Sequence, residues 1–180
     1  ATGKNVVLEG GTENDTLWAN GSLHSNGETS YVADGKAILD GGAGRDYIYA
    51  NNYNISTVSG GTGDDEINVN NDVWGSNNAA HVKNSTTSIS GGEGNDYADV
   101  SHHKTASLQG DAGDDHLYAS AVQSSTLNGG AGSDLLTAYT NNEYTNYTSG
   151  DETAAVQTVL DGGEGNDKLT ISGTAYTYSG

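Results

Sequence analysis

The chain has 180 residues, of which 33% are hydrophobic, and its 24 acidic residues outnumber the 6 basic ones to give a net charge of −18. Nucleic acids and anionic membrane surfaces are bound through Lys and Arg, so this balance excludes both as expected partners and favours cations. No run of 18 apolar residues occurs, so we expect no membrane insertion.

A glycine-rich hexapeptide that ends in Asp recurs along the chain, with first residues at positions 10, 41, 60, 91, 110, 129 and 162. The steps are 31, 19, 31, 19, 19 and 33 residues, which is a 19-residue unit with extra segments near 20–35, 70–85 and 139–155. A fixed period predicts stacked repeats. We expect residues 1–180 to form a single domain of about seven coils, an excerpt of a longer protein.

Two short strands are predicted in every unit. After each hexapeptide, apolar residues alternate with polar ones, as in a strand with one buried face. The inward positions are Leu17, Ala19, Ile48, Ala50, Ile67, Val69, Ala98, Val100, Leu117, Ala119, Leu136, Ala138, Leu169 and Ile171. A second strand precedes each hexapeptide and carries an inward residue two positions before it: Leu8, Leu39, Val58, Ile89, Leu108, Leu127 and Leu160.

Neither strand of a unit can bury its apolar side alone. Stacking the units at the strand spacing of ~4.8 Å gives two parallel sheets that face each other across a thin core. The 27 glycines interrupt every helix-length window, so we expect an all-β fold. The prediction is a right-handed parallel β-solenoid, with the hexapeptide turns stacked on one edge and the three insertions on the opposite edge.

The hexapeptide has the chemistry of a calcium-binding turn. Glycine at its first, second and fourth positions lets backbone carbonyl oxygens converge, and the sixth-position Asp adds a carboxylate. Flexible arrays of six to eight oxygen donors bind Ca²⁺, whereas Mg²⁺ requires a tighter octahedron and zinc prefers nitrogen and sulfur ligands. A single copy could serve only as a turn, but without a cation seven stacked carboxylates would repel one another and their pKa values would rise.

The repeated turns resemble the GGxGxDxUx motif of the repeats-in-toxin (RTX) family, over almost the whole chain. The resemblance implies that Ca²⁺ lies between stacked turns and binds the Asp of both turns together with backbone carbonyls. The carboxylates carried over are Asp15, Asp46, Asp65, Asp96, Asp115, Asp134 and Asp167. The glycine-rich positions carried over are Gly41, Gly42, Gly44, Gly60, Gly61, Gly63, Gly91, Gly92, Gly94, Gly110, Gly113, Gly129, Gly130, Gly132, Gly162, Gly163 and Gly165.

The turns also depart from the family pattern. Because each 19-residue coil has one turn, all turns lie on one edge and form a single column of at most six Ca²⁺ sites. Glu13 replaces the fourth glycine of the first turn, which makes the site between Asp15 and Asp46 the weakest expectation. Asp111 replaces the second glycine of the fifth turn, where its carboxylate could add a ligand.

Two outward surfaces suggest further binding. Aromatic residues that can stack on sugar rings are Trp18, Tyr47, Tyr49, Tyr97 and Tyr118 on the strands after the turns, and Trp74 in the second insertion. The alternative is a cross-strand ladder that only stiffens the sheet. The other sheet presents Ser, Thr, Gln and Asn, similar to the more regular Thr faces of some calcium-dependent ice-binding solenoids. We expect His102 and His103 to be solvent-facing strand residues and the chain not to be an enzyme.

The expected function is that of a structural or adhesive module whose folding depends on calcium, within a secreted or cell-surface bacterial protein. We expect a monomeric module within a larger chain. The RTX resemblance implies that the repeats stay unfolded in low cytosolic calcium for type I secretion and fold outside the cell. The main alternative is a calcium-dependent carbohydrate-binding module attached to a polysaccharide-acting enzyme, with a surface glycan as partner. Ice binding is a weaker alternative.

Overall fold

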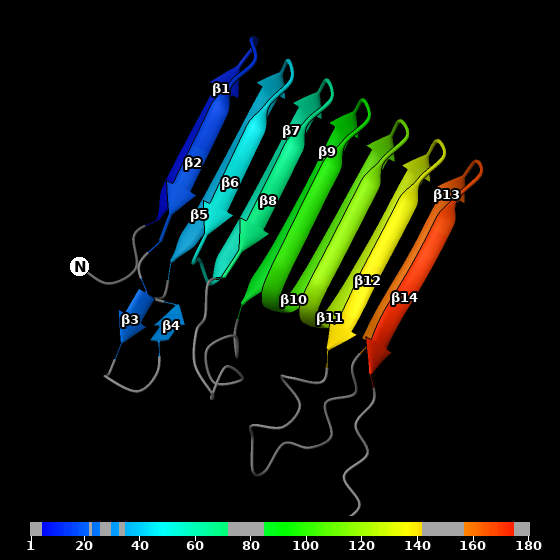
Figure 1. Cartoon of the computed structure of the whole chain (residues 1–180). Coiled ribbons are helices and arrows are strands. Elements are labelled where there is room, and N and C mark those ends of the chain that lie inside the picture. The colour runs from blue at the N-terminus through cyan, green and yellow to red at the C-terminus, as the bar shows by residue number, and fades with distance from the viewer. Residues whose placement is uncertain are drawn as a thin grey trace, which may run out of the picture.

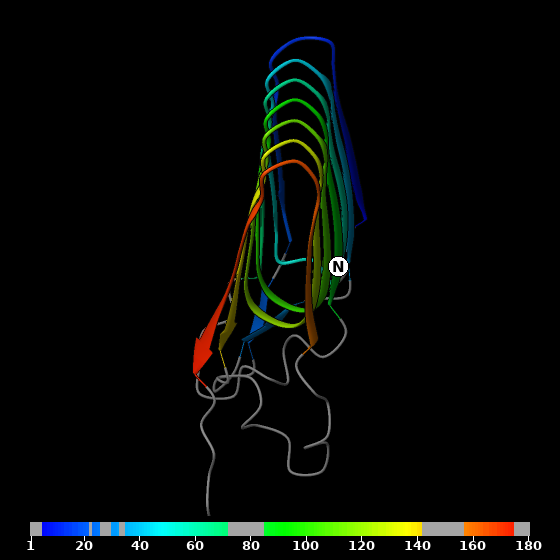
Figure 2. The ribbon, with the colours of Figure 1, turned by 90° about the vertical axis from the view of Figure 1, so that its right-hand side faces the viewer.

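A computed structural model describes residues 5–21, 23–25, 30–32, 35–71, 85–141 and 157–174. Over these residues the chain forms strands joined by turns and contains no helix, and therefore no helix that could cross a membrane. The strands stack in chain order along one axis (Figure 1), and Figure 2 shows the coils as narrow arches whose two sides face each other and are joined at one edge by the turns. The predicted all-β parallel solenoid is confirmed.

Each coil contributes one strand before its hexapeptide turn and one strand after it. The strands before the turns are β1 (Val6–Gly11), β5 (Lys36–Ala43), β7 (Ile55–Thr62), β9 (Thr86–Glu93) and β13 (Gln157–Glu164). The strands after the turns are β2 (Thr16–Asn20), β6 (Tyr47–Asn51), β8 (Glu66–Asn70), β12 (Leu135–Asn141) and β14 (Lys168–Thr174). Two long strands, β10 (Tyr97–Ala112) and β11 (His116–Ala131), bend around the opposite edge and belong to both sheets.

The stacked strands pair in parallel, and their register follows the sequence repeat. Leu39 pairs with Val58, and Ile48 with Ile67, across steps of 19 residues, while Val58 pairs with Ile89 across a step of 31. The extra segments fall between β2 and β5, β8 and β9, and β12 and β13, and these strands end and begin at the edge opposite the hexapeptides. Most residues of the second and third segments, Trp74 among them, lie outside the described residues, so the placement of these two segments stays a prediction. The first segment contains a small antiparallel pair, β3 (Leu23–Ser25) with β4 (Ser30–Val32). The insertions therefore leave the stacking register unchanged.

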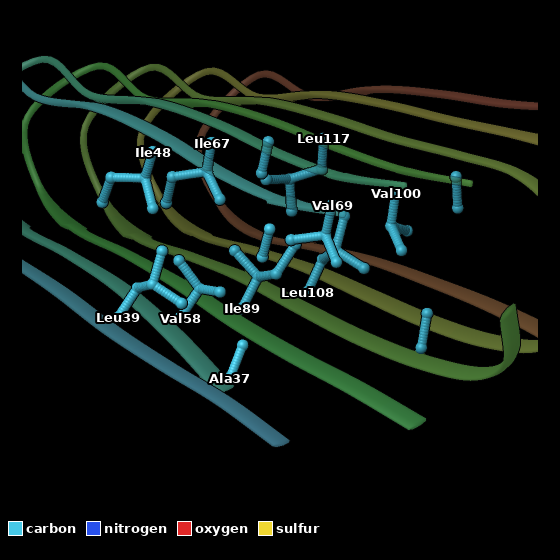
Figure 3. Packing of buried hydrophobic residues seen from close by; sticks show 14 of the residues in the cluster. Ala37, Leu39, Ile48, Val58, Ile67, Val69, Ile89, Val100, Leu108 and Leu117 are labelled. Atoms are coloured by element: carbon cyan, nitrogen blue, oxygen red, sulfur yellow. The ribbon is translucent and has the colours of Figure 1, made fainter. Parts of the chain in front are cut away.

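The core is a thin layer of aliphatic side chains between the two sheets. Leu39, Val58, Ile89 and Leu108 come from the strands before the turns and face Ile48, Ile67, Val69, Val100 and Leu117 from the strands after them (Figure 3). A third inward rank, four residues before each turn, is small or polar: Ala37, Ser56, Thr87, Ala106 and Ser125 are buried. Each internal coil therefore buries only a few apolar side chains.

The seventh coil differs from the others at its inward positions. Leu169 and Ile171 are 45% and 57% exposed, whereas the corresponding Leu136 and Ala138 of the sixth coil are buried. Among the described residues, no strand stacks on β14 beyond its pairing with β12. The prediction that all inward positions are buried was therefore wrong for this coil, which has a described coil on one side only. The first coil differs, since its Leu17 and Ala19 are buried although β2 pairs only with β6.

A second correction concerns His103, which was predicted to face solvent but is 1% exposed. His102 before it has a positive φ of 61°, as do Asn52 and Ala121 at the same unit position, and this turns the next side chain into the core. Nδ1 of His103 donates to the carbonyl of Ser101 at 2.8 Å, which leaves Nε2 to accept from the Asn71 amide at 3.1 Å. Burial lowers the pKa of His103 to about 4, so the ring is neutral.

Because the inward side chains of the seventh coil are partly exposed and those of the interior coils are buried, the same substitution should have unequal effects along the stack. In calcium-saturated protein we expect Leu117→Ala to lower the free energy of unfolding by about 2–5 kcal/mol, as for a fully enclosed leucine. Leu169→Ala should lower it much less, since nearly half of that side chain already contacts water. Urea unfolding followed by circular dichroism measures both, and equal losses would contradict the described packing.

Candidate metal centre

The hexapeptide turns have a backbone that requires glycine. The second and fourth glycines have positive φ, for example 112° at Gly61 and 121° at Gly63. A Cβ added to Gly61 would lie 1.9 Å from the carbonyl oxygen of Gly42 in the preceding coil, which is far inside van der Waals contact. The close approach of neighbouring turns therefore favours glycine at these positions, and Asp111 is an exception that keeps a positive φ of 75°.

The sixth-position carboxylates form a continuous ladder along this edge. One oxygen of each Asp accepts a hydrogen bond from the backbone N–H of the Asp in the preceding coil, at 2.7 Å between Asp15 and Asp46 and 2.8 Å between Asp96 and Asp115. The same bond joins every consecutive pair down to Asp134 and Asp167. The five interior carboxylates are only 0–3% exposed.

The second oxygen of each interior carboxylate lacks a hydrogen-bond partner. Oδ2 is buried and unsatisfied in Asp46, Asp65, Asp96, Asp115 and Asp134. Each of these atoms points to the first glycine of its own turn. A buried charged oxygen without a partner is costly, so these positions require a cation or a proton.

A carbonyl oxygen from the next turn faces the same space. A Cβ added to Gly60 would lie 2.4 Å from Oδ2 of Asp65 and 2.5 Å from the carbonyl oxygen of Gly91. The equivalent pair of oxygens surrounds Gly41, Gly91, Gly110 and Gly129. Each junction between interior turns therefore contains a recess, left open by a missing Cβ, where a carboxylate oxygen of one coil meets a carbonyl oxygen of the next.

The electrostatics of the column are those of crowded, desolvated anions. Burial raises the pKa of Asp65 to about 6, of Asp96 to about 7 and of Asp115 to about 6. Neighbouring carboxylates raise these pKa values further, while the hydrogen bond from the preceding backbone N–H lowers them. In the absence of a cation, Asp65, Asp96 and Asp115 therefore bind protons close to neutral pH.

The donor set of the recesses fits a hard cation. Each interior turn supplies one buried carboxylate, and no group of three His, Cys, Asp or Glu side chains converges within the described part of the chain. The other available donors are backbone carbonyl oxygens. An all-oxygen, carbonyl-rich set matches Ca²⁺ and not zinc.

The sequence pattern of one family, described as the RTX calcium-binding nonapeptide repeat, matches this chain in four copies. The matched residues are 4–22, 31–52, 107–121, 124–151 and 159–170, together more than half of the chain. The chain belongs to the RTX calcium-binding repeat family. Comparisons with curated proteins and with solved structures gave no match.

Membership of the RTX family makes calcium binding a shared property of these turns. The matched segments do not include the hexapeptides that begin at residues 60 and 91. These two turns nevertheless have the same positive φ at Gly61 and Gly92 and the same carboxylate hydrogen bonds as their neighbours. The structure therefore extends the RTX geometry to the centre of the column.

Three further predicted ligands, Asp15, Asp111 and Asp167, are less buried than the five interior carboxylates. Asp15 and Asp167, at the two ends of the column, are only half-buried. Asp111 keeps the positive φ of the glycine it replaces, but its carboxylate is exposed and accepts a hydrogen bond from the Ser90 hydroxyl. A role for Asp111 as a metal ligand stays a prediction.

An outer ladder at the fifth hexapeptide position was missed by the sequence analysis. The side chains of Asn14, Asp64, Asn95 and Asp114 each accept from the backbone N–H one coil further along. The sequence does contain a signal for this ladder, since the fifth residue is Asn or Asp in five of the seven hexapeptides. This ladder runs in the direction opposite to the inner one, so most junctions between turns have hydrogen bonds of both directions.

The raised pKa values predict how the calcium-free chain responds to pH. The folded-state pKa of about 6–7 lies above the usual value of about 4 in an unfolded chain, so protonation favours the folded state. This stability is fully present near pH 4 and is lost as pH rises through 7. For protein stripped of calcium by a chelating resin, we expect more β signal in circular dichroism at pH 5 than at pH 8.

Asp96→Asn is the matched variant for this pH response, because the amide oxygen still accepts the bond from the Asp65 N–H but cannot titrate. Its gain in β signal between pH 8 and pH 5 should be smaller than that of the unmodified chain. An equal response of both proteins, or none in either, would contradict titration of the buried column.

Proposed function

We propose that this chain is a calcium-dependent structural module in which Ca²⁺ ions bind between consecutive turns and hold the coils together. The observation that carries the proposal is the repeated buried Oδ2 atom, unsatisfied in all five interior carboxylates and opposed by a glycine carbonyl of the next turn. The proposed ligands are the seven sixth-position Asp residues and the carbonyl groups of the glycine-rich turns. Seven turns then form up to six sites in one column.

Calcium binding and coil stacking are the same event in this arrangement. A site that takes ligands from two turns exists only when those turns are stacked, so its binding free energy adds directly to folding. The aliphatic layer is thin, and the calcium-free column contains crowded carboxylates. We therefore infer that the chain does not maintain its coils at neutral pH without calcium.

This dependence suits a protein that crosses an export apparatus as an unfolded chain and folds outside the cell. RTX repeat proteins are typically secreted or extracellular. We propose that this module is a stalk or adhesive segment of a secreted or cell-surface protein, that it is monomeric within its chain, and that it has no catalytic role. Carbohydrate binding is the second candidate function, and it is favoured by a hollow on the outer sheet described in the next subsection.

The first test of the proposal is the effect of calcium on the fold. At neutral pH in EGTA we expect a disordered circular-dichroism spectrum, and a β spectrum after Ca²⁺ is added. The transition should be steeper than binding to one site, because each ion orders a coil that helps to form the next site. Mg²⁺ at the same concentration should have a much smaller effect. A β spectrum and melting temperature that do not change in EGTA would refute the proposal.

The second test compares carboxylates at different places in the column. Asp96→Ala and Asp115→Ala remove interior ligands, so each should raise the calcium midpoint of folding several-fold more than Asp15→Ala at the half-buried end. Asp96→Asn is the control for the hydrogen-bond ladder, because it keeps an acceptor for the Asp65 N–H while losing the charge. If Asp96→Asn folds at the midpoint of the unmodified chain, the carboxylate does not bind the metal.

A further inference from the structure

The outward face of the strands after the turns contains a hollow over the third coil. It has a volume of about 220 Å³ and is lined by Tyr49, Asn51, Asn68, Val69, Asn70, Asp99 and Ser101. Apart from Val69, which faces the core, these residues occupy equivalent outward positions in β6, β8 and β10, which are neighbours in the sheet. Asn68, in the middle strand, has a shorter side chain than Tyr49 beside it.

The two sides of the hollow are chemically different. Tyr49 in the second coil forms an aromatic wall, and Asp99 in the fourth coil forms an acidic one. Two strand spacings separate these coils, a distance of about 10 Å between backbones. That width admits one six-membered sugar ring between the walls, with the strand bearing Asn68 and Asn70 as the floor.

The walls and floor are held in place before any ligand binds. Trp18 packs against Tyr49 with ring centroids 5.7 Å apart, and the Tyr49 hydroxyl donates to Glu66 at 3.4 Å. The carbonyl oxygen of the Asn70 side chain accepts from the Ser101 hydroxyl at 2.7 Å. A site whose side chains are already fixed loses little conformational entropy on binding.

Polar groups at the floor remain available. Among the described residues, the Asn51 side chain has no hydrogen-bond partner. The amide nitrogen of Asn68 donates to Glu66 at 3.3 Å, and the side-chain carbonyl oxygen of Asn68 has no partner among the described residues. Amide and carboxylate groups beside an aromatic ring match a ligand with several hydroxyl groups and one flat apolar face. Other rings of this face also pair with each other, as Tyr97 does with His116 and Tyr118 with Tyr139, but they lie outside the hollow.

From this arrangement we infer that the hollow binds one residue of a neutral hexopyranose glycan, which stacks on Tyr49 and hydrogen-bonds to Asn51, Asn68 and Asp99. Glu66 and Asp99 disfavour acidic sugars, because a uronate or sulfate group would meet like charge. The inference rests on the proposed function, since the three coils that line the hollow come together only in the stacked, calcium-bound chain. It names the ligand class and the position of the carbohydrate site.

The experiment titrates the calcium-loaded, ¹⁵N-labelled chain with maltotriose, cellotriose, mannotriose and trigalacturonic acid, each followed by two-dimensional NMR. Binding of at least one neutral trisaccharide should shift the Asn51 and Asn68 side-chain amide signals saturably, while trigalacturonic acid should not. Tyr49→Ala should weaken this binding about tenfold, the effect of losing one aromatic stacking contact. Asn68→Tyr should abolish binding by filling the hollow.

The matched control is Tyr118→Ala, which removes an aromatic ring from the same face but outside the hollow. Its affinity should equal that of the unmodified chain. The inference is overturned if no neutral trisaccharide gives a saturable shift, if Asn68→Tyr still binds, or if Tyr118→Ala weakens binding as much as Tyr49→Ala. Circular dichroism of every variant in calcium comes first, so loss of the fold, which concerns the calcium proposal, is distinguished from loss of the sugar site.

Discussion

The whole structure depends on one constraint, the in-register parallel stacking that places each unit position directly above the same position of the next coil. Because of this register, any residue type that recurs in the repeat becomes a column: aliphatic side chains in the core, glycines at the turns and carboxylates along one edge. A favourable contact is therefore repeated at every junction, and so is an unfavourable one. The fold can tolerate the carboxylate column only if something neutralises it.

In the turns, the two oxygen atoms of each carboxylate have different roles. One oxygen of each Asp satisfies a backbone N–H of the neighbouring turn, which fixes the position of the side chain without any metal. The other oxygen is left without a donor and faces a carbonyl group. Two acceptors facing each other in a buried place repel, and a cation between them converts that repulsion into attraction. The hydrogen-bond ladder therefore pre-organises the turns, and the ion supplies the remaining stability.

Much of this architecture follows from the sequence, because a 19-residue period and a repeated hexapeptide determine the register, the edge of the turns and the position of the insertions. The prediction from the sequence was wrong where the alternation of inward and outward side chains along a strand is interrupted. A positive φ at His102 turns His103 inward, and a residue-by-residue alternation cannot show this reversal. The exposure of Leu169 depends on a neighbouring coil and not on its own segment. The hollow beside Tyr49 likewise depends on side chains from three coils that are separated along the chain.

The placement of the insertions gives the two edges of the solenoid different freedom to change. At the edge with the hexapeptides, a Cβ at most of the glycine positions would collide with a neighbouring carbonyl group, so variation is restricted at these positions. At the opposite edge, segments of 12 to 14 residues enter between paired strands without moving the register. Closing a longer loop adds little entropic cost, since that cost grows only with the logarithm of length. New sequence can therefore accumulate at one edge during evolution, or be grafted there by design, while the other edge preserves the fold.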